Sequence, residues 1–97
     1  MRHDIRLAPE AVEDLRRLSA RDRALAREAM ERHLRYDPAR VAGSRIERLR
    51  GIGRPQFRLR VEDLRIFYDV AGSTVEVLAV VSKSHAEWLA QFGEVEP

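Results

Sequence analysis

Cysteine is absent from this 97-residue chain, so neither a disulfide framework nor a thiolate metal site can form. A reducing, cytoplasmic location agrees with that absence and is what we expect. No hydrophobic run approaches transmembrane length, and the N-terminal residues lack a signal-peptide core, so we expect no membrane partner. Lysine is nearly absent too: Lys83 is the only one among eighteen basic residues. A GC-rich genome also produces such a bias, so arginine content alone predicts no site.

The length suits one small domain spanning residues 1–97, and an apolar fraction of 44% supplies one core. Two glycines and a proline fall within residues 49–55, in the stretch Leu-Arg-Gly-Ile-Gly-Arg-Pro. Their spacing is neither that of a P-loop nor that of a dinucleotide-binding fingerprint. We therefore expect no nucleotide cofactor here, and no metal or other cofactor elsewhere.

The most informative stretch runs from residue 57 to residue 70. Apolar and polar residues alternate through Phe-Arg-Leu-Arg-Val, and after Glu62 and Asp63 a second run follows. In that run Leu64, Ile66, Tyr68 and Val70 alternate with Arg65, Phe67 and Asp69. Alternation of this kind predicts a β-hairpin with one face on a core. Arg58, Arg60 and Arg65 then share the other face, where three guanidiniums favour a phosphate or carboxylate ligand.

Charge is distributed unevenly along the chain. Residues 45–65 carry seven arginines and three acids, net +4, whereas the whole chain is net +2, so the remainder is net −2. An anionic partner should therefore contact this region. The candidate phosphate-binding residues are Arg45, Arg48, Arg50, Arg54 and Arg58.

Other segments complete a predicted β-α-α-β-β-β-α order. A short strand covers residues 2–7, one helix begins at Pro9, and a second, capped by Ser19 with Asp22, runs to about Tyr36. A polar connector spans 38–48, an apolar strand 75–81, and a last helix 84–93. We expect an α+β fold: a twisted, mostly antiparallel four-stranded sheet with a helical hairpin on one face and the last helix at an edge or end of the other. The expected core comprises Val12, Leu15, Leu18, Met30, Leu34, Leu59, Ile66, Tyr68, Val77 and Leu78.

This arrangement resembles the RelE/ParE superfamily, the toxin halves of bacterial type II toxin–antitoxin pairs. The resemblance rests on Leu49-x-Gly51, on the alternating Arg58 and Arg60, and on the block from Leu64 to Tyr68. It covers nearly the whole chain. It implies a cognate antitoxin as partner, with which the toxin forms a hetero-oligomer.

Ribosome-dependent members of the superfamily cleave messenger RNA by attack of a 2′-hydroxyl on the adjacent phosphate. By resemblance, Arg60 and Arg65 would stabilise the phosphorane, Lys83 would protonate the leaving oxygen, and His85 would be the nearest available base. Arg60 stands where a lysine often serves as base, and arginine does not lose its proton in proteins. Leu89, beside Trp88, stands where a tyrosine is common.

Several alternatives stay open at this point. The arginines of the hairpin could pair internally with Glu47, Glu62, Asp63 or Asp69. The chain could be a ribosome-dependent mRNA endoribonuclease that inhibits translation, a ParE-like toxin that inhibits DNA gyrase without nuclease activity, or a toxin-fold protein that mainly binds its antitoxin. The intact arginine series favours the first, and the missing lysine and tyrosine favour the others.

Overall fold

A computed structural model describes residues 1–41, 43, 45–50 and 53–82. Its elements, in chain order, are β1 (Asp4–Leu7), α1 (Pro9–Arg17), α2 (Ala20–Leu34), β2 (Ile46–Arg48), β3 (Phe57–Val61), β4 (Leu64–Ala71) and β5 (Thr74–Ser82). The predicted C-terminal helix and its capping residues lie outside the described residues.

The strands form one sheet in the order β1-β5-β4-β3-β2. β1 pairs with β5 in parallel, and the other pairings are antiparallel. The α+β class is confirmed, but the described sheet has five strands rather than four, because β2 forms within the predicted connector. β2 is only three residues long and contains two charged residues, so it lacks an alternating apolar pattern. Its strand conformation comes from pairing with β3, and the bond from the amide of Arg60 to the carbonyl of Arg45, 3.0 Å, extends that pairing.

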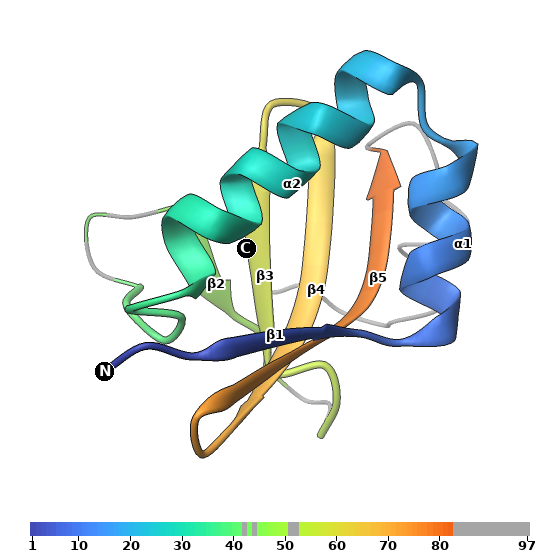
Figure 1. Ribbon diagram of the computed structural model, residues 1–97. Coiled ribbons are helices and arrows are strands. Elements are labelled where there is room, and N and C mark those ends of the chain that lie inside the picture. The colour runs from blue at the N-terminus through green and yellow to red at the C-terminus, as the bar shows by residue number, and fades with distance from the viewer. Residues whose placement is uncertain (42, 44, 51–52, 83–97) are drawn as a thin grey trace.

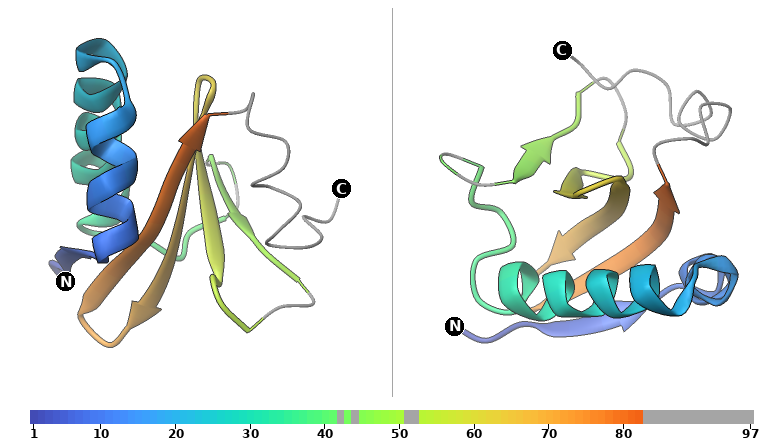
Figure 2. Two further views of the ribbon diagram at one scale, coloured as in Figure 1. Left: turned by 90° about the vertical axis from the view of Figure 1, so that its right-hand side faces the viewer. Right: turned by 90° about the horizontal axis from the view of Figure 1, so that it is seen from above.

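Both helices lie on the same face of the sheet, as two views of the ribbon agree (Figures 1 and 2). The Ser19 hydroxyl accepts a hydrogen bond from the amide of Asp22, 3.1 Å, which confirms the predicted cap of α2. α2 ends at Leu34, two residues before the predicted end. The carbonyl of Arg35 accepts a bond from the amide of His3, 2.6 Å, which ties the end of α2 to the segment leading into β1.

The main core lies between the helices and the sheet. Leu59, Ile66 and Tyr68 have no exposed surface, and fully burying an aliphatic side chain of this size contributes about 1.5–3 kcal/mol. Phe57 stacks on Tyr68 with ring centroids 5.4 Å apart. The Tyr68 hydroxyl donates to the carbonyl of Pro38, 2.5 Å. This bond ties the connector after α2 to the middle of the sheet.

Seven of the ten expected core residues are buried, and Val12, Leu18 and Leu78 are only partly buried. The reason for Leu78 is a bulge in β5: Phe67 pairs with Ala79 while Tyr68 pairs with Val77, so Leu78 has no partner on β4. Asp14, a buried acid of α1, accepts a bond from the amide of Val80, 2.9 Å. A side chain of α1 thus binds the backbone of β5 close to the bulge.

Candidate anion-binding surface

Three arginines lie on the face of the sheet opposite the helices. Arg60 pairs directly with Arg65 across β3 and β4, and Arg58 pairs with Phe67. Their neighbours along β3, which point the other way, belong to the core beneath the helices. We call Arg58, Arg60 and Arg65 the arginine surface. The hairpin alternation read from the sequence predicted this common face.

Among the described residues, one carboxylate is in ion-pair contact with this surface. Glu47 of β2 pairs with Arg58 of β3 in the sheet register, and its Oε1 accepts bonds from Nε of Arg58, at 2.9 Å, and from Nη2 of the same guanidinium. Nε of Arg60 lies 3.8 Å from the other oxygen of Glu47. The Arg58 side chain is 14% exposed and that of Arg60 is 48% exposed. Internal pairing therefore holds Arg58 firmly and Arg60 only loosely.

Arg65 makes a different set of contacts. Its Nη1 donates to the carbonyls of Glu62 and Leu64, both at 2.9 Å. Among the described residues, no carboxylate lies within ion-pair distance of its guanidinium. Burial, followed by the nearby charges of Arg58 and Arg60, lowers the pKa of Arg65. The guanidinium nevertheless stays protonated at neutral pH. Among the described residues, three neighbouring cations thus have one carboxylate, Glu47, in ion-pair contact with two of them.

Apolar side chains adjoin the arginine surface on the same face. Leu49, Phe67, Ala79 and Val81 form a second buried cluster, separate from the main core. Phe67 pairs with Arg58 in the register and has no exposed surface. Electrostatic interactions strengthen where apolar groups exclude water. This cluster therefore favours strong binding of an anion beside it.

Arg54 does not join the arginine surface. Its Nε donates to Asp69, 2.7 Å, and its Nη2 to Glu76, 3.1 Å. The hydrogen bond to Asp69 is the main reason that the pKa of Arg54 is raised. Asp69 also accepts a bond from the amide of Gln56, 2.7 Å. Arg54 therefore fastens the segment before β3 to β4 and β5.

The remaining predicted phosphate ligands are dispersed. Arg48 alternates with Glu47 and so points to the other face, where its guanidinium lies 5.2 Å from the ring centre of Phe57. Arg50 is exposed beyond the end of β2. Arg45 lies immediately before β2, next to Arg60, and lines a pocket. Lys83 and His85, predicted as acid and base, lie outside the described residues, as do Trp88 and Leu89.

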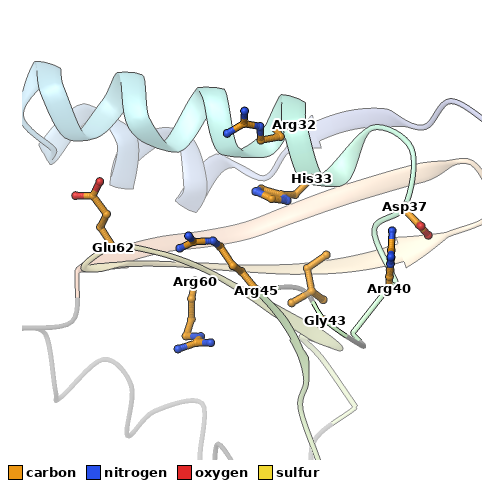
Figure 3. Close-up of a pocket in the computed structure, with 9 residues that line it drawn as sticks. Arg32, His33, Asp37, Arg40, Gly43, Arg45, Arg60 and Glu62 are labelled. Atoms are coloured by element: carbon orange, nitrogen blue, oxygen red, sulfur yellow. The ribbon is translucent and has the colours of Figure 1, made fainter.

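That pocket, which we call the α2 pocket, was not predicted from the sequence. It has a volume of about 650 Å³ and lies between the end of α2, the connector and the β2–β3 edge (Figure 3). Its lining consists of Arg32, His33, Asp37, Arg40, Gly43, Arg45, Ile46, Arg60 and Glu62. The sequence signal was weak: two basic residues in the last turn of α2 usually only complement the helix dipole.

Within the described residues, no group of three potential metal ligands occurs. In the same part of the chain, no helix is long and apolar enough to cross a membrane.

Comparison with protein families identifies the class of molecule. The model for the ParE toxin of the type II toxin–antitoxin system matches residues 5–87. The chain belongs to this family, and hence to the RelE/ParE superfamily of toxins. No curated protein matches significantly.

Solved structures agree with the family assignment. A chain of the RelBE2 toxin–antitoxin complex from Mycobacterium tuberculosis matches with a TM-score of 0.74 at 25% identity, covering 84% of this chain and 92% of that one. A chain of the archaeal RelE–RelB complex from Pyrococcus horikoshii matches with a TM-score of 0.69 at 20% identity, and the match covers 88% of this chain and 99% of that one. A mutant of the E. coli toxin RelE in the free state matches with a TM-score of 0.69 at 21% identity, and the match covers 95% of this chain and 94% of that one. The protein is a toxin of a type II toxin–antitoxin system with RelE-like structural neighbours.

Proposed function

We propose that this toxin is a ribosome-dependent mRNA endoribonuclease that inhibits translation in the cytoplasm and is held inactive by a cognate antitoxin. One observation carries the proposal: Arg60 and Arg65 face each other across β3 and β4, and Glu47 is the only acid that the described residues bring into ion-pair contact with the arginine surface. Like charges directly opposite in a sheet are destabilising. A phosphate held between them would relieve that repulsion.

The reaction requires charge stabilisation, a base and an acid. Arg60 and Arg65 would hold the scissile phosphate and stabilise the phosphorane formed when the 2′-hydroxyl attacks. Arg58 lies beside them but is bound to Glu47, so its main effect is to fix that carboxylate. The leaving 5′-oxygen needs a proton, and Lys83 is our candidate acid.

The base has two candidates. His85 was proposed from the sequence because imidazole titrates near neutral pH. Beside the arginine surface lies a second proton acceptor, Glu47, whose carboxylate is 3.8 Å from Nε of Arg60. A carboxylate is in general a weak base at neutral pH. Orientation of the 2′-hydroxyl by the ribosome would compensate for a weak base, so isolated RNA should be cut slowly or not at all.

The antitoxin follows from the class of protein. The matched structures include three toxin–antitoxin complexes, from Mycobacterium tuberculosis, Pyrococcus horikoshii and Methanococcus jannaschii. Antitoxin tails that fold on binding commonly add a helix in a groove or a strand at a sheet edge. We expect co-expression with the protein encoded beside this toxin to give a complex that co-purifies. Separation of the two at low salt would contradict this expectation.

The deciding experiment is expression without the antitoxin, with mapping of the 5′ ends of cellular messages. Growth arrest and new cleavage sites should appear for the wild type and disappear for Arg65→Ala. Losing one well-placed charge in such a site lowers the rate on the order of a hundredfold or more. Arg27→Ala is the matched control, because Arg27 is an exposed arginine on α2 and should change neither readout.

A second candidate function is inhibition of DNA gyrase by binding, which the ParE family match favours. Under this alternative, growth arrest would come with DNA damage and without new message ends. Arrest that persists in Arg65→Ala, with no cleavage, would end the nuclease proposal and support the gyrase alternative. Normal growth of cells that contain the free toxin would favour a protein that mainly binds its antitoxin.

A further inference from the structure

The α2 pocket has an excess of positive charge. Four arginines are among its lining residues, Arg32, Arg40, Arg45 and Arg60, together with Asp37, Glu62 and His33. The helix dipole accounts for Arg32 and His33 in the last turn of α2. It does not account for Arg45, which enters the pocket from the segment before β2.

Ion pairs among the described residues do not neutralise two of these arginines, Arg32 and Arg45. Glu62 already pairs with Arg21 of α2, at 3.3 Å. Within the described part of the chain, neither Arg32 nor Arg45 has a carboxylate in ion-pair contact. Figure 3 draws His33 extending from α2 into the pocket toward Arg45. Arg32 and His33 of α2 and Arg45 of the segment before β2 therefore line one open volume.

The pocket and the arginine surface meet at Arg60, on the edge of the sheet. The amide of Arg60 donates to the carbonyl of Arg45, 3.0 Å, so the two residues are neighbours at the sheet edge. Arg60 lines the pocket, yet its side chain points away from α2, toward the opposite face (Figure 3). The charges thus run from Arg32 past Arg45 to Arg60 and on to Arg65, around the end of β2.

We propose that Arg32, His33 and Arg45 form a second phosphate-binding subsite, and that an RNA strand bound at the arginine surface continues around the β2 edge into the α2 pocket. This inference rests on the proposed function and assigns a path to its substrate. Guanidiniums suit phosphate oxygens because they donate in a planar fork. Spaced guanidiniums along an open, continuous path fit the repeating charge of a nucleic-acid backbone.

The test uses binding rather than cleavage. A short single-stranded RNA in which every 2′-hydroxyl is methylated cannot be cut by 2′-hydroxyl attack. Its affinity for the antitoxin-free, full-length toxin is measured by fluorescence anisotropy over a range of salt concentrations. The pocket variant is Arg32→Gln with Arg45→Gln. The control is Arg16→Gln with Arg27→Gln, which removes the same charge from exposed positions outside the pocket.

The pocket variant should bind about tenfold more weakly, as removal of a charge-assisted hydrogen bond predicts. The slope of log affinity against log salt should become shallower by about 0.7 for each phosphate that the variant no longer binds. The control variant should match the wild type, and all three proteins should have the same circular dichroism spectrum and melting temperature.

Equal loss of affinity in pocket and control variants would overturn the subsite, because only net charge would then matter. Unchanged RNA affinity with weakened antitoxin binding would also overturn it and would assign the pocket to an acidic segment of the antitoxin. The nuclease proposal is judged separately, by message cleavage in cells. RNA binding without any cleavage would leave the subsite standing and end the nuclease proposal.

Discussion

Glu47 of β2 lies directly opposite Arg58 of β3, and its Oε1 accepts a bond of 2.9 Å from Nε of that guanidinium. The same carboxylate approaches Arg60. Glu47 thus offsets the repulsion between the guanidiniums of Arg58 and Arg60. This position gives Glu47 two possible effects on the reaction, one as a base and one as a positioning group.

Replacing Glu47 by Gln separates these effects. The amide oxygen can still accept a bond from Arg58, so the geometry should survive, but the amide cannot take a proton. If Glu47 is the base, ribosome-dependent cleavage should fall by a factor of about 100 or more. Affinity for the methylated RNA should stay the same or rise, because a negative charge is lost. Unchanged cleavage in this variant, together with loss in His85→Gln, would assign the base to His85.

Replacing Arg65 by Gln should separate activity from stability. The guanidinium is partly buried and faces Arg60 across the strands, and both conditions lower its pKa. A lowered arginine pKa means that the charged guanidinium destabilises the folded state. This loss of stability does not change with pH near neutrality, because arginine loses its proton only at much higher pH. We expect urea unfolding to give a gain of about 0.2–1 kcal/mol alongside loss of toxicity. A destabilisation exceeding about 1 kcal/mol would mean that the bonds from Arg65 to the backbone outweigh the repulsion.

Replacing Asp14 by Ala should destabilise the fold by about 1–3 kcal/mol, the cost of a buried donor left unsatisfied. The donor is the amide of Val80, 2.9 Å from Asp14 Oδ2. Glu13→Ala is the matched control on the same helix, because Glu13 forms only an exposed pair with Arg16. Chemical denaturation measures both variants. Equal stability of the two would contradict a structural role for Asp14.

RNA affinity should depend on pH through His33. Burial, followed by Arg32 and Arg45, lowers the pKa of this imidazole in the free toxin. A bound phosphate favours the protonated form, so the pKa is higher in the complex and affinity should rise as pH falls through that value. The other charged groups lining the pocket and its continuation along α2 are Glu28, Asp37, Arg40, Arg60 and Glu62.

NMR titration of the His33 ring, with and without the methylated RNA, measures both pKa values. His33→Gln should bind with the same affinity at pH 5.5 and pH 7.5, within a factor of about two for small residual charge effects. A pH dependence that survives in this variant would place the titrating group elsewhere.

The sequence predicted those parts of the fold that local patterns determine. The hairpin, the cap at Ser19 and the shared face of Arg58, Arg60 and Arg65 all follow from alternation, from capping chemistry or from both. β2 could not be predicted, because its three residues owe their conformation to β3. The bulge was hidden for a different reason: residues 77–81 are all apolar, so the register carries no polarity signal.

The candidate site was predicted less completely than the fold. Counting charges over residues 45–65 grouped seven arginines that the sheet then separates. Arg48 points to the opposite face, and Arg54 pairs with Asp69 and Glu76. The approach of Arg32 and His33 to Arg45 depends on how α2 lies across the sheet. No local sequence pattern indicates that these three residues lie close together.

The bulge at Leu78 has a consequence for how this small protein uses its sheet. Before Leu78, the odd-numbered residues Val75 and Val77 belong to the main core; after it, Val80 does, while Ala79 and Val81 join the second cluster. One strand therefore supplies apolar side chains to both faces. If β5 had no bulge and alternated strictly through Leu78, Ala79 and Val81 would face the main core and Val80 would face the other side. The apolar support of the arginine surface thus depends on one extra residue in β5 as well as on the composition of that strand.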